Sequence, residues 1–163
     1  FRFRTADVSD AAILAEFNCR LAWETEQRQL DRDLVLAGVQ GGLQRYPEVR
    51  YFVAETDELV IGQLMLTREW SDWRNGWMIW LQSVYVQSNC RRRRVFQRLL
   101  QFAIQQPALQ RSGHRLIACP QLHAGNVVDI GGRDDAAGFA SFQNRGQRMR
   151  VGCAKCATAC SRR

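Results

Sequence analysis

Four consecutive arginines give this chain its clearest chemical signal. An apolar stretch, residues 77–86, runs into a short polar loop that leads into Arg91, Arg92, Arg93 and Arg94 at the start of an expected helix. The first N–H groups of a helix have no partner inside it, and the helix dipole adds partial positive charge there. With arginine side chains around it, such a helix start suits a phosphate group. The pattern therefore predicts a ligand that carries phosphate.

The same basic run also fits a nucleic-acid patch or a simple solvated helix start. Its place directly after a buried strand favours a pocket for a small phosphate ligand, so nucleic acid is the weaker expectation. Four nearby tryptophans could line an acceptor site or stack on bases, but core and hairpin cross-strand contacts explain them more simply. These are Trp70, Trp73, Trp77 and Trp80.

Length and charge limit the function classes. The 163 residues suffice for one domain, which we expect over residues 1–140, followed by a basic, cysteine-containing tail, residues 141–163. Residues 1–106 hold 14 Arg and 13 Asp or Glu, whereas residues 107–163 hold 9 basic and 3 acidic residues. A nearly neutral body weakens a nucleic-acid interpretation of the net charge of +7. No segment suits a membrane span or a secretory signal, which predicts a cytoplasmic protein without a membrane partner.

Apolar periodicity predicts the elements that position the arginines. Strands are expected at residues 1–5, 51–55, 60–67, 77–86 and 114–119, with hairpin turns at Asp57-Glu58 and Asn75-Gly76. The unbroken apolar run of residues 77–86 suits a central strand covered on both faces. Helices are expected after Ser9-Asp10, over residues 31–45, and after the arginines. The core face of the last helix is expected to comprise Val95, Phe96, Leu99, Leu100, Phe102 and Ala103.

Residues 51–102 resemble the GNAT acyltransferase superfamily. YFVAETDELVIGQLMLT is similar to that family's second and third strands. WLQSVYVQSNCRRRRVFQRLL is similar to its acyl-coenzyme A signature, in which a strand, an Arg-x-x-Gly-x-Gly/Ala motif or a close variant, and a helix follow one another. EWSDWRNGW resembles a subgroup of small bacterial members, and the opening Arg4-Thr5-Ala6-Asp7 also fits the family.

The resemblance implies an α/β (α+β) fold with a mixed, mostly antiparallel sheet, helices on both faces, and a gap after the central strand. Acetyl-coenzyme A would be the acyl donor, and a small-molecule or peptide amine would attack its thioester directly. The pantetheine arm would bond to the backbone edge of Ser83, Val84, Tyr85 and Val86. The diphosphate would lie on the amides of Arg91, Arg92, Arg93, Arg94, Val95 and Phe96, with Asn126 as a further cofactor-binding residue.

The resemblance also assigns the catalytic roles. The backbone N–H of Val84 would stabilise the developing oxyanion. A base must remove a proton from the amine, but the central strand carries no carboxylate. Glu69, at the end of the preceding strand, and Glu24 or Glu26, after the first helix, are the candidates, with plain surface carboxylates as the alternative. The tyrosine that often serves as general acid is missing after Asn126.

Two further departures weaken an enzymatic interpretation. Arg94 stands where the family pattern has glycine, and a left-handed conformation there would cost an arginine ~1–2 kcal/mol. Its guanidinium would either offset this by binding phosphate or block the ligand. The last third of the chain changes abruptly in charge, glycine and cysteine content, which either divergence or a shifted reading frame would explain.

The tail cysteines Cys153, Cys156 and Cys160 have metal-ligand spacing, but zinc usually needs a fourth ligand, so we expect no metal.

Three functions stay open. The first is an acetyl-coenzyme A-dependent N-acetyltransferase. The second is a non-catalytic relative that binds coenzyme A or a protein partner, and the third is a nucleic-acid-binding module. The acceptor amine and the oligomeric state cannot be read from the chain, and a homodimer is left open.

Overall fold

The computed structural model describes residues 1–73, 75–107, 115–118, 141–144 and 147–150. The chain groups into two compact units. The first unit comprises Phe1–Thr67 and Ser83–Arg111, and the second comprises Arg68–Gln82 and Ser112–Arg163.

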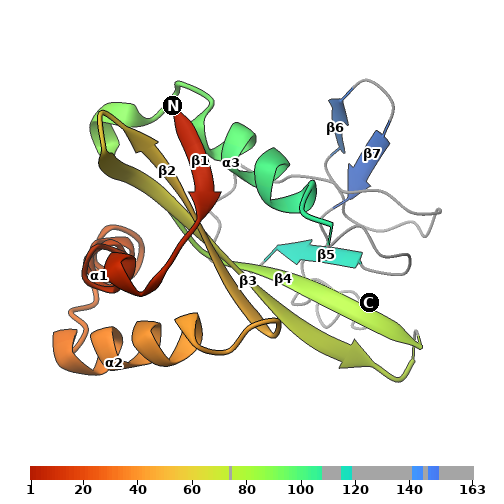
Figure 1. The fold of residues 1–163 in the computed structure, drawn as a ribbon, viewed down its shortest axis with the longest axis horizontal. Coiled ribbons are helices and arrows are strands. Elements are labelled where there is room, and N and C mark those ends of the chain that lie inside the picture. The colour runs from red at the N-terminus through yellow and green to blue at the C-terminus, as the bar shows by residue number, and fades with distance from the viewer. Residues whose placement is uncertain (74, 108–114, 119–140, 145–146, 151–163) are drawn as a thin grey trace, which may run out of the picture. The chain divides into compact units, whose positions relative to one another are not determined.

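Strands and helices follow the predicted order along the chain (Figure 1). The elements are β1 Arg2–Thr5, η1 Val8–Asp10, α1 Ala11–Glu26, α2 Arg32–Leu43, β2 Val49–Thr56, β3 Leu59–Ser71, β4 Gly76–Val86, η2 Ser88–Cys90, α3 Val95–Ile104, β5 Arg115–Ala118, β6 Ser141–Asn144 and β7 Gln147–Arg150. The first five strands join in one sheet of order β1-β2-β3-β4-β5, in which β1, β2 and β3 pair antiparallel and β5 runs parallel to β4, and β6 and β7 form a second sheet. A mixed, mostly antiparallel sheet with helices is the predicted fold class, which is thereby confirmed.

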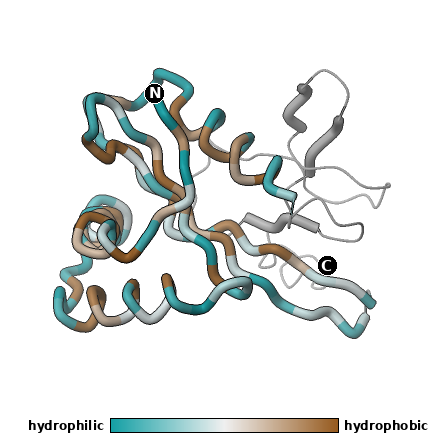
Figure 2. Tube along the Cα trace, viewed as in Figure 1, coloured by the Kyte–Doolittle hydropathy of each residue, from teal (hydrophilic) through white to brown (hydrophobic). Residues whose placement is uncertain are grey.

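Alternating residues of β2 show that the first unit buries both faces of its sheet. Tyr51 and Val53 pack in one apolar cluster with residues of α1 and α2. Phe52, which points to the opposite face, lies edge-on to Phe102 of α3, with ring centroids 6.2 Å apart. Figure 1 shows α1 and α2 on one side of these strands and α3 on the other. Figure 2 shows apolar and polar segments alternating along each helix, as amphipathic packing requires.

The structure differs from the sequence-based expectation in two places. Burial along β4 alternates, with Ile79, Leu81 and Tyr85 buried and the residues beside them half-buried, so its two faces are not covered equally. The apolar composition of this strand, which is rich in aromatic residues, had predicted full cover on both faces. The tail, in which no strand was predicted, contains β6 and β7, which pair antiparallel with each other.

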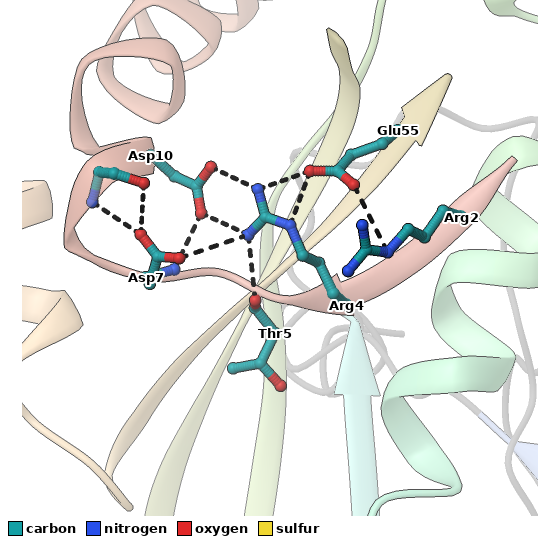
Figure 3. A network of polar contacts seen from close by, with 7 residues as sticks. Arg2, Arg4, Thr5, Asp7, Asp10 and Glu55 are labelled. Atoms are coloured by element: carbon teal, nitrogen blue, oxygen red, sulfur yellow. Dashed lines mark hydrogen bonds and ion pairs between the residues drawn. The ribbon is translucent and has the colours of Figure 1, made fainter. Parts of the chain in front are cut away.

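A buried charge network fixes the start of the chain to the sheet (Figure 3). The Arg4 guanidinium donates to Glu55 at 2.6 Å and to both carboxylate oxygens of Asp10 at 2.7 and 2.8 Å. Asp10 and Glu55 are only 5% and 8% exposed. Asp10 also accepts from the backbone N–H of Asp7 in a capping box at the entry to the first helix. One arginine therefore joins β1, β2 and the start of α1.

Replacing Arg4 should destabilise the fold strongly. Arg4→Met leaves two buried carboxylates without their cation, and we expect a loss of about 3–5 kcal/mol in the free energy of unfolding. Arg2→Met is the matched control, because the Arg2 side chain is 79% exposed and 3.9 Å from Glu55. It should cost less than about 1 kcal/mol. Urea denaturation measures both changes, and equal losses for the two variants would contradict the network's role.

Candidate active site

The end of β4 continues directly into the arginine loop. β4 ends at Val86, η2 makes one short turn at Ser88–Cys90, and α3 begins at Val95. The pairing of β4 with β5 covers Met78 to Leu81, so the described part of β5 does not reach Ser83. Residues 83–86 and the arginine loop all belong to the first unit. The proposed pantetheine strand and the proposed diphosphate loop are thus one continuous segment.

Two arginines of this loop adopt left-handed backbone conformations. Arg92 has φ 63° and Arg94, the N-cap of α3, has φ 60° and ψ 21°. The strain expected at Arg94 is therefore present, whereas Arg92 was not anticipated. Left-handed residues next to a helix start turn successive backbone N–H groups toward one point, which is a geometry that binds anions. Arg94 also makes no side-chain cap, which leaves first-turn N–H groups of α3 available to a ligand.

Arg91 behaves differently from the three arginines that follow it. Its Nε donates to the Val86 carbonyl at 2.8 Å, and its Nη2 donates to Glu24 Oε2 at 2.5 Å. Its guanidinium also lies 5.4 Å from the centroid of the Tyr85 ring. These contacts fold the loop back on the end of β4. All four arginines are exposed, so among the described residues Arg91 differs from the three that follow it in these contacts and not in exposure.

The carboxylate of Glu24 accepts hydrogen bonds from two side chains. In addition to Arg91, the Tyr85 hydroxyl donates to Glu24 Oε1 at 3.0 Å. Tyr85 is buried and packs on Phe17, with ring centroids 4.9 Å apart. Burial, and then the hydrogen bond to Glu24, raise the pKa of Tyr85 above its ordinary value, so the hydroxyl stays protonated near neutral pH. The structure thus brings together Glu24, Tyr85 and Arg91, all expected near the site.

The other carboxylate candidates are Glu69 and Glu26. Glu69 belongs to the second unit, where it accepts a hydrogen bond from the Trp80 indole. Glu26 is exposed near the end of α1. In the second unit Trp70 lies edge-on to Trp77, at 5.3 Å between centroids, which confirms the expected contact across the hairpin. Trp70, Trp73 and Trp77 are exposed, so the expected place in the core is wrong for these three.

A buried amide beside β4 was missed by sequence reasoning. Gln63 of β3 is fully buried, and its Nε2 donates to Asn18 Oδ1 at 2.7 Å and to the Ser83 carbonyl at 3.2 Å. Ser83 has φ 47°, an unusual value inside a strand. The available signal was a single amide residue inside the apolar run VIGQLML. Its partners lie 20 and 45 residues away, beyond any local pattern.

Some predicted site residues fall outside the described part of the chain. Asn126 and the cysteines at 153, 156 and 160 are among them. Within the described residues, no group of three His, Cys, Asp or Glu side chains could hold a metal ion. No helix in that part of the chain is long and apolar enough to cross a membrane.

Glycine at the two left-handed arginine positions should stabilise the protein. Arg92→Gly and Arg94→Gly each remove the clash that a side chain suffers at positive φ, and we expect a gain of about 1 kcal/mol for each. Arg93→Gly removes the same charge from the same loop, but Arg93 is not among the residues at positive φ. This control should be neutral or cost up to ~1 kcal/mol. Thermal melting measures the three variants, and a gain for Arg93→Gly as large as the others would contradict backbone strain.

Comparisons with known proteins agree on the family. Residues 15–127 match the profile of the acetyltransferase (GNAT) family. A solved structure described as "a possible acetyltransferase" from Clostridium difficile 630 is 38% identical, covers 71% of this chain and 77% of its own, and superposes with a TM-score of 0.62. No curated protein matches the chain.

Two more distant structures share the fold. A predicted acetyltransferase from Clostridium acetobutylicum, solved with acetyl-CoA, is 15% identical over 72% of this chain and 79% of its own, with a TM-score of 0.61. An aminoglycoside acetyltransferase from an uncultured soil metagenomic sample, solved with sisomicin, is 14% identical over 72% and 75%, with a TM-score of 0.54. From the family profile and the 38% identical structure together, the chain belongs to the acetyltransferase (GNAT) family, whose acyl donor is acetyl-coenzyme A.

Proposed function

We propose that the protein transfers an acetyl group from acetyl-coenzyme A to a primary amine by direct attack. The observation that carries the proposal is the arginine loop, where two left-handed residues precede a helix start and Arg91 ties the loop to the end of β4. Backbone N–H groups there would bind the diphosphate. The exposed side chains of Arg92, Arg93 and Arg94 would add positive charge around the phosphates.

The proposed reaction needs one bond formed and one broken. The amine lone pair attacks the thioester carbonyl carbon, and the carbonyl oxygen becomes an oxyanion that accepts from the Val84 N–H. The carbon–sulfur bond then breaks, and coenzyme A leaves as a thiolate that takes up a proton. The amine nitrogen loses a proton to a carboxylate or to an ordered water. Holding the two substrates in the reactive geometry would supply much of the rate acceleration.

Glu24 and Glu69 are the carboxylates we propose for proton removal or acceptor binding. Both oxygens of Glu24 already accept hydrogen bonds, from Tyr85 and Arg91. This observation also favours a second candidate function, a non-catalytic relative that binds coenzyme A without transferring the acetyl group. The acceptor of an active enzyme would be a small molecule or a peptide amine.

Donor binding tests the diphosphate site. Acetyl-coenzyme A should raise the melting temperature, because a ligand that binds only the native state stabilises it. S-acetyl-N-acetylcysteamine, which has the thioester but no diphosphate, should give little or no rise at the same concentration. Differential scanning fluorimetry measures both shifts. Equal shifts for the two donors would contradict diphosphate binding by the arginine loop. The absence of any shift with millimolar acetyl-coenzyme A would contradict the proposed function.

Measurements of turnover test which group removes the proton from the amine. Thiol release from acetyl-coenzyme A across a panel of small amines and peptides separates the enzyme from the non-catalytic relative, which binds without release. For an active acceptor, Glu24→Gln or Glu69→Gln should lower kcat by about 10²-fold if that residue takes the proton. Glu48→Gln is an exposed control that should leave kcat unchanged. An unchanged kcat for both test variants would assign proton removal to water.

A further inference from the structure

We propose that Gln63 is a positioning residue that aims the backbone N–H of Val84 at the thioester oxygen. The inference rests on the proposed function, since it concerns the donor that would stabilise the oxyanion. Gln63 lies on β3, beside the stretch of β4 where the backbone departs from regular strand geometry at Ser83. Its amide donates to the Ser83 carbonyl at 3.2 Å.

The direction of the Val84 N–H follows from this hydrogen bond. The Ser83–Val84 peptide bond is not among the cis bonds of the chain, and in a planar trans peptide the C=O and N–H point in opposite directions. Because the Ser83 carbonyl turns toward Gln63, the Val84 N–H turns away from it. The positive φ of Ser83 makes this orientation of the peptide unfavourable by itself. The hydrogen bond from Gln63 offsets that cost and keeps the Val84 N–H pointing away from Gln63.

The surroundings of Gln63 keep its amide in place. The side chain is fully buried, and its Nε2 also donates to Asn18 Oδ1 of α1 at 2.7 Å. The Ser83 carbonyl can only accept a hydrogen bond, so it requires the amide nitrogen on this side, while Gln63 Oε1 is buried without a hydrogen-bond partner among the described residues. Gly62, the preceding residue, allows β3 to approach β4 closely, because a Cβ there would lie 3.1 Å from the Tyr85 carbonyl oxygen. The amide is thus fixed between a helix and two strands.

Infrared spectroscopy of bound acetyl-coenzyme A, labelled with ¹³C at the carbonyl, tests the inference without an acceptor. A hydrogen bond from Val84 polarises the carbonyl and lowers its stretching frequency in the wild-type complex. Gln63→Met keeps the size of the side chain but removes both donors, so the frequency should return toward that of free acetyl-coenzyme A. With an active amine, kcat should fall about 10-fold while the KM for acetyl-coenzyme A stays within about twofold.

Val39→Ala is the control for lost stability. Val39 of α2 is buried in the apolar cluster with residues of α1 and β2, so this variant should melt earlier but keep the wild-type carbonyl frequency. Should Gln63→Met fail to fold, Gln63→Leu replaces it, because leucine also has no hydrogen-bond donor for the Ser83 carbonyl. A wild-type frequency in the Gln63 variant overturns the inference alone. A wild-type complex without a lowered frequency overturns the proposed oxyanion contact, and the inference with it.

Discussion

The contact between Arg91 and the end of β4 is the interaction on which the site depends. One guanidinium donates to the Val86 carbonyl and to Glu24, and Glu24 in turn accepts from Tyr85. The four residues come from α1, β4 and the loop before α3. Because charge-assisted hydrogen bonds are stronger than neutral ones, this chain of contacts holds the loop in register with the strand. It would thereby fix the distance between the proposed thioester site on β4 and the proposed diphosphate site at α3.

The scaffold around this contact is built from packing that is independent of it. Alternating residues of β2 bury both faces of the sheet, with α1 and α2 on one side and α3 on the other. α1 then carries Asn18 to Gln63 of β3 and Glu24 to Tyr85 of β4. The Arg4 network sets the start of this helix. The helix that supplies core residues therefore also positions the polar groups of the site.

Local patterns were sufficient to predict most elements and the arginine loop between β4 and α3. The apolar periodicity, the Asp57-Glu58 and Asn75-Gly76 turns and the arginine run depend on neighbouring residues alone. The contacts that give the site its geometry were not predictable in this way. Gln63 reaches Ser83 across 20 residues, and Arg91 reaches Glu24 across 67. The left-handed conformation of Arg92 is likewise a property of the folded backbone, which an arginine in the sequence does not indicate.

Backbone strain marks the same segment independently of any side-chain contact. Among the described residues, seven that are not glycine have positive φ. Four of them are explained by local structure, since they lie in the β2–β3 and β3–β4 turns or end α1: Asp57, Glu58, Asn75 and Gln27. The remaining three, Ser83, Arg92 and Arg94, lie within twelve consecutive residues at the proposed thioester and diphosphate sites. Strained residues persist where the surrounding structure holds them, and they concentrate at functional sites. The Gln63 amide holds the first of them, and Arg91 anchors the loop that contains the other two.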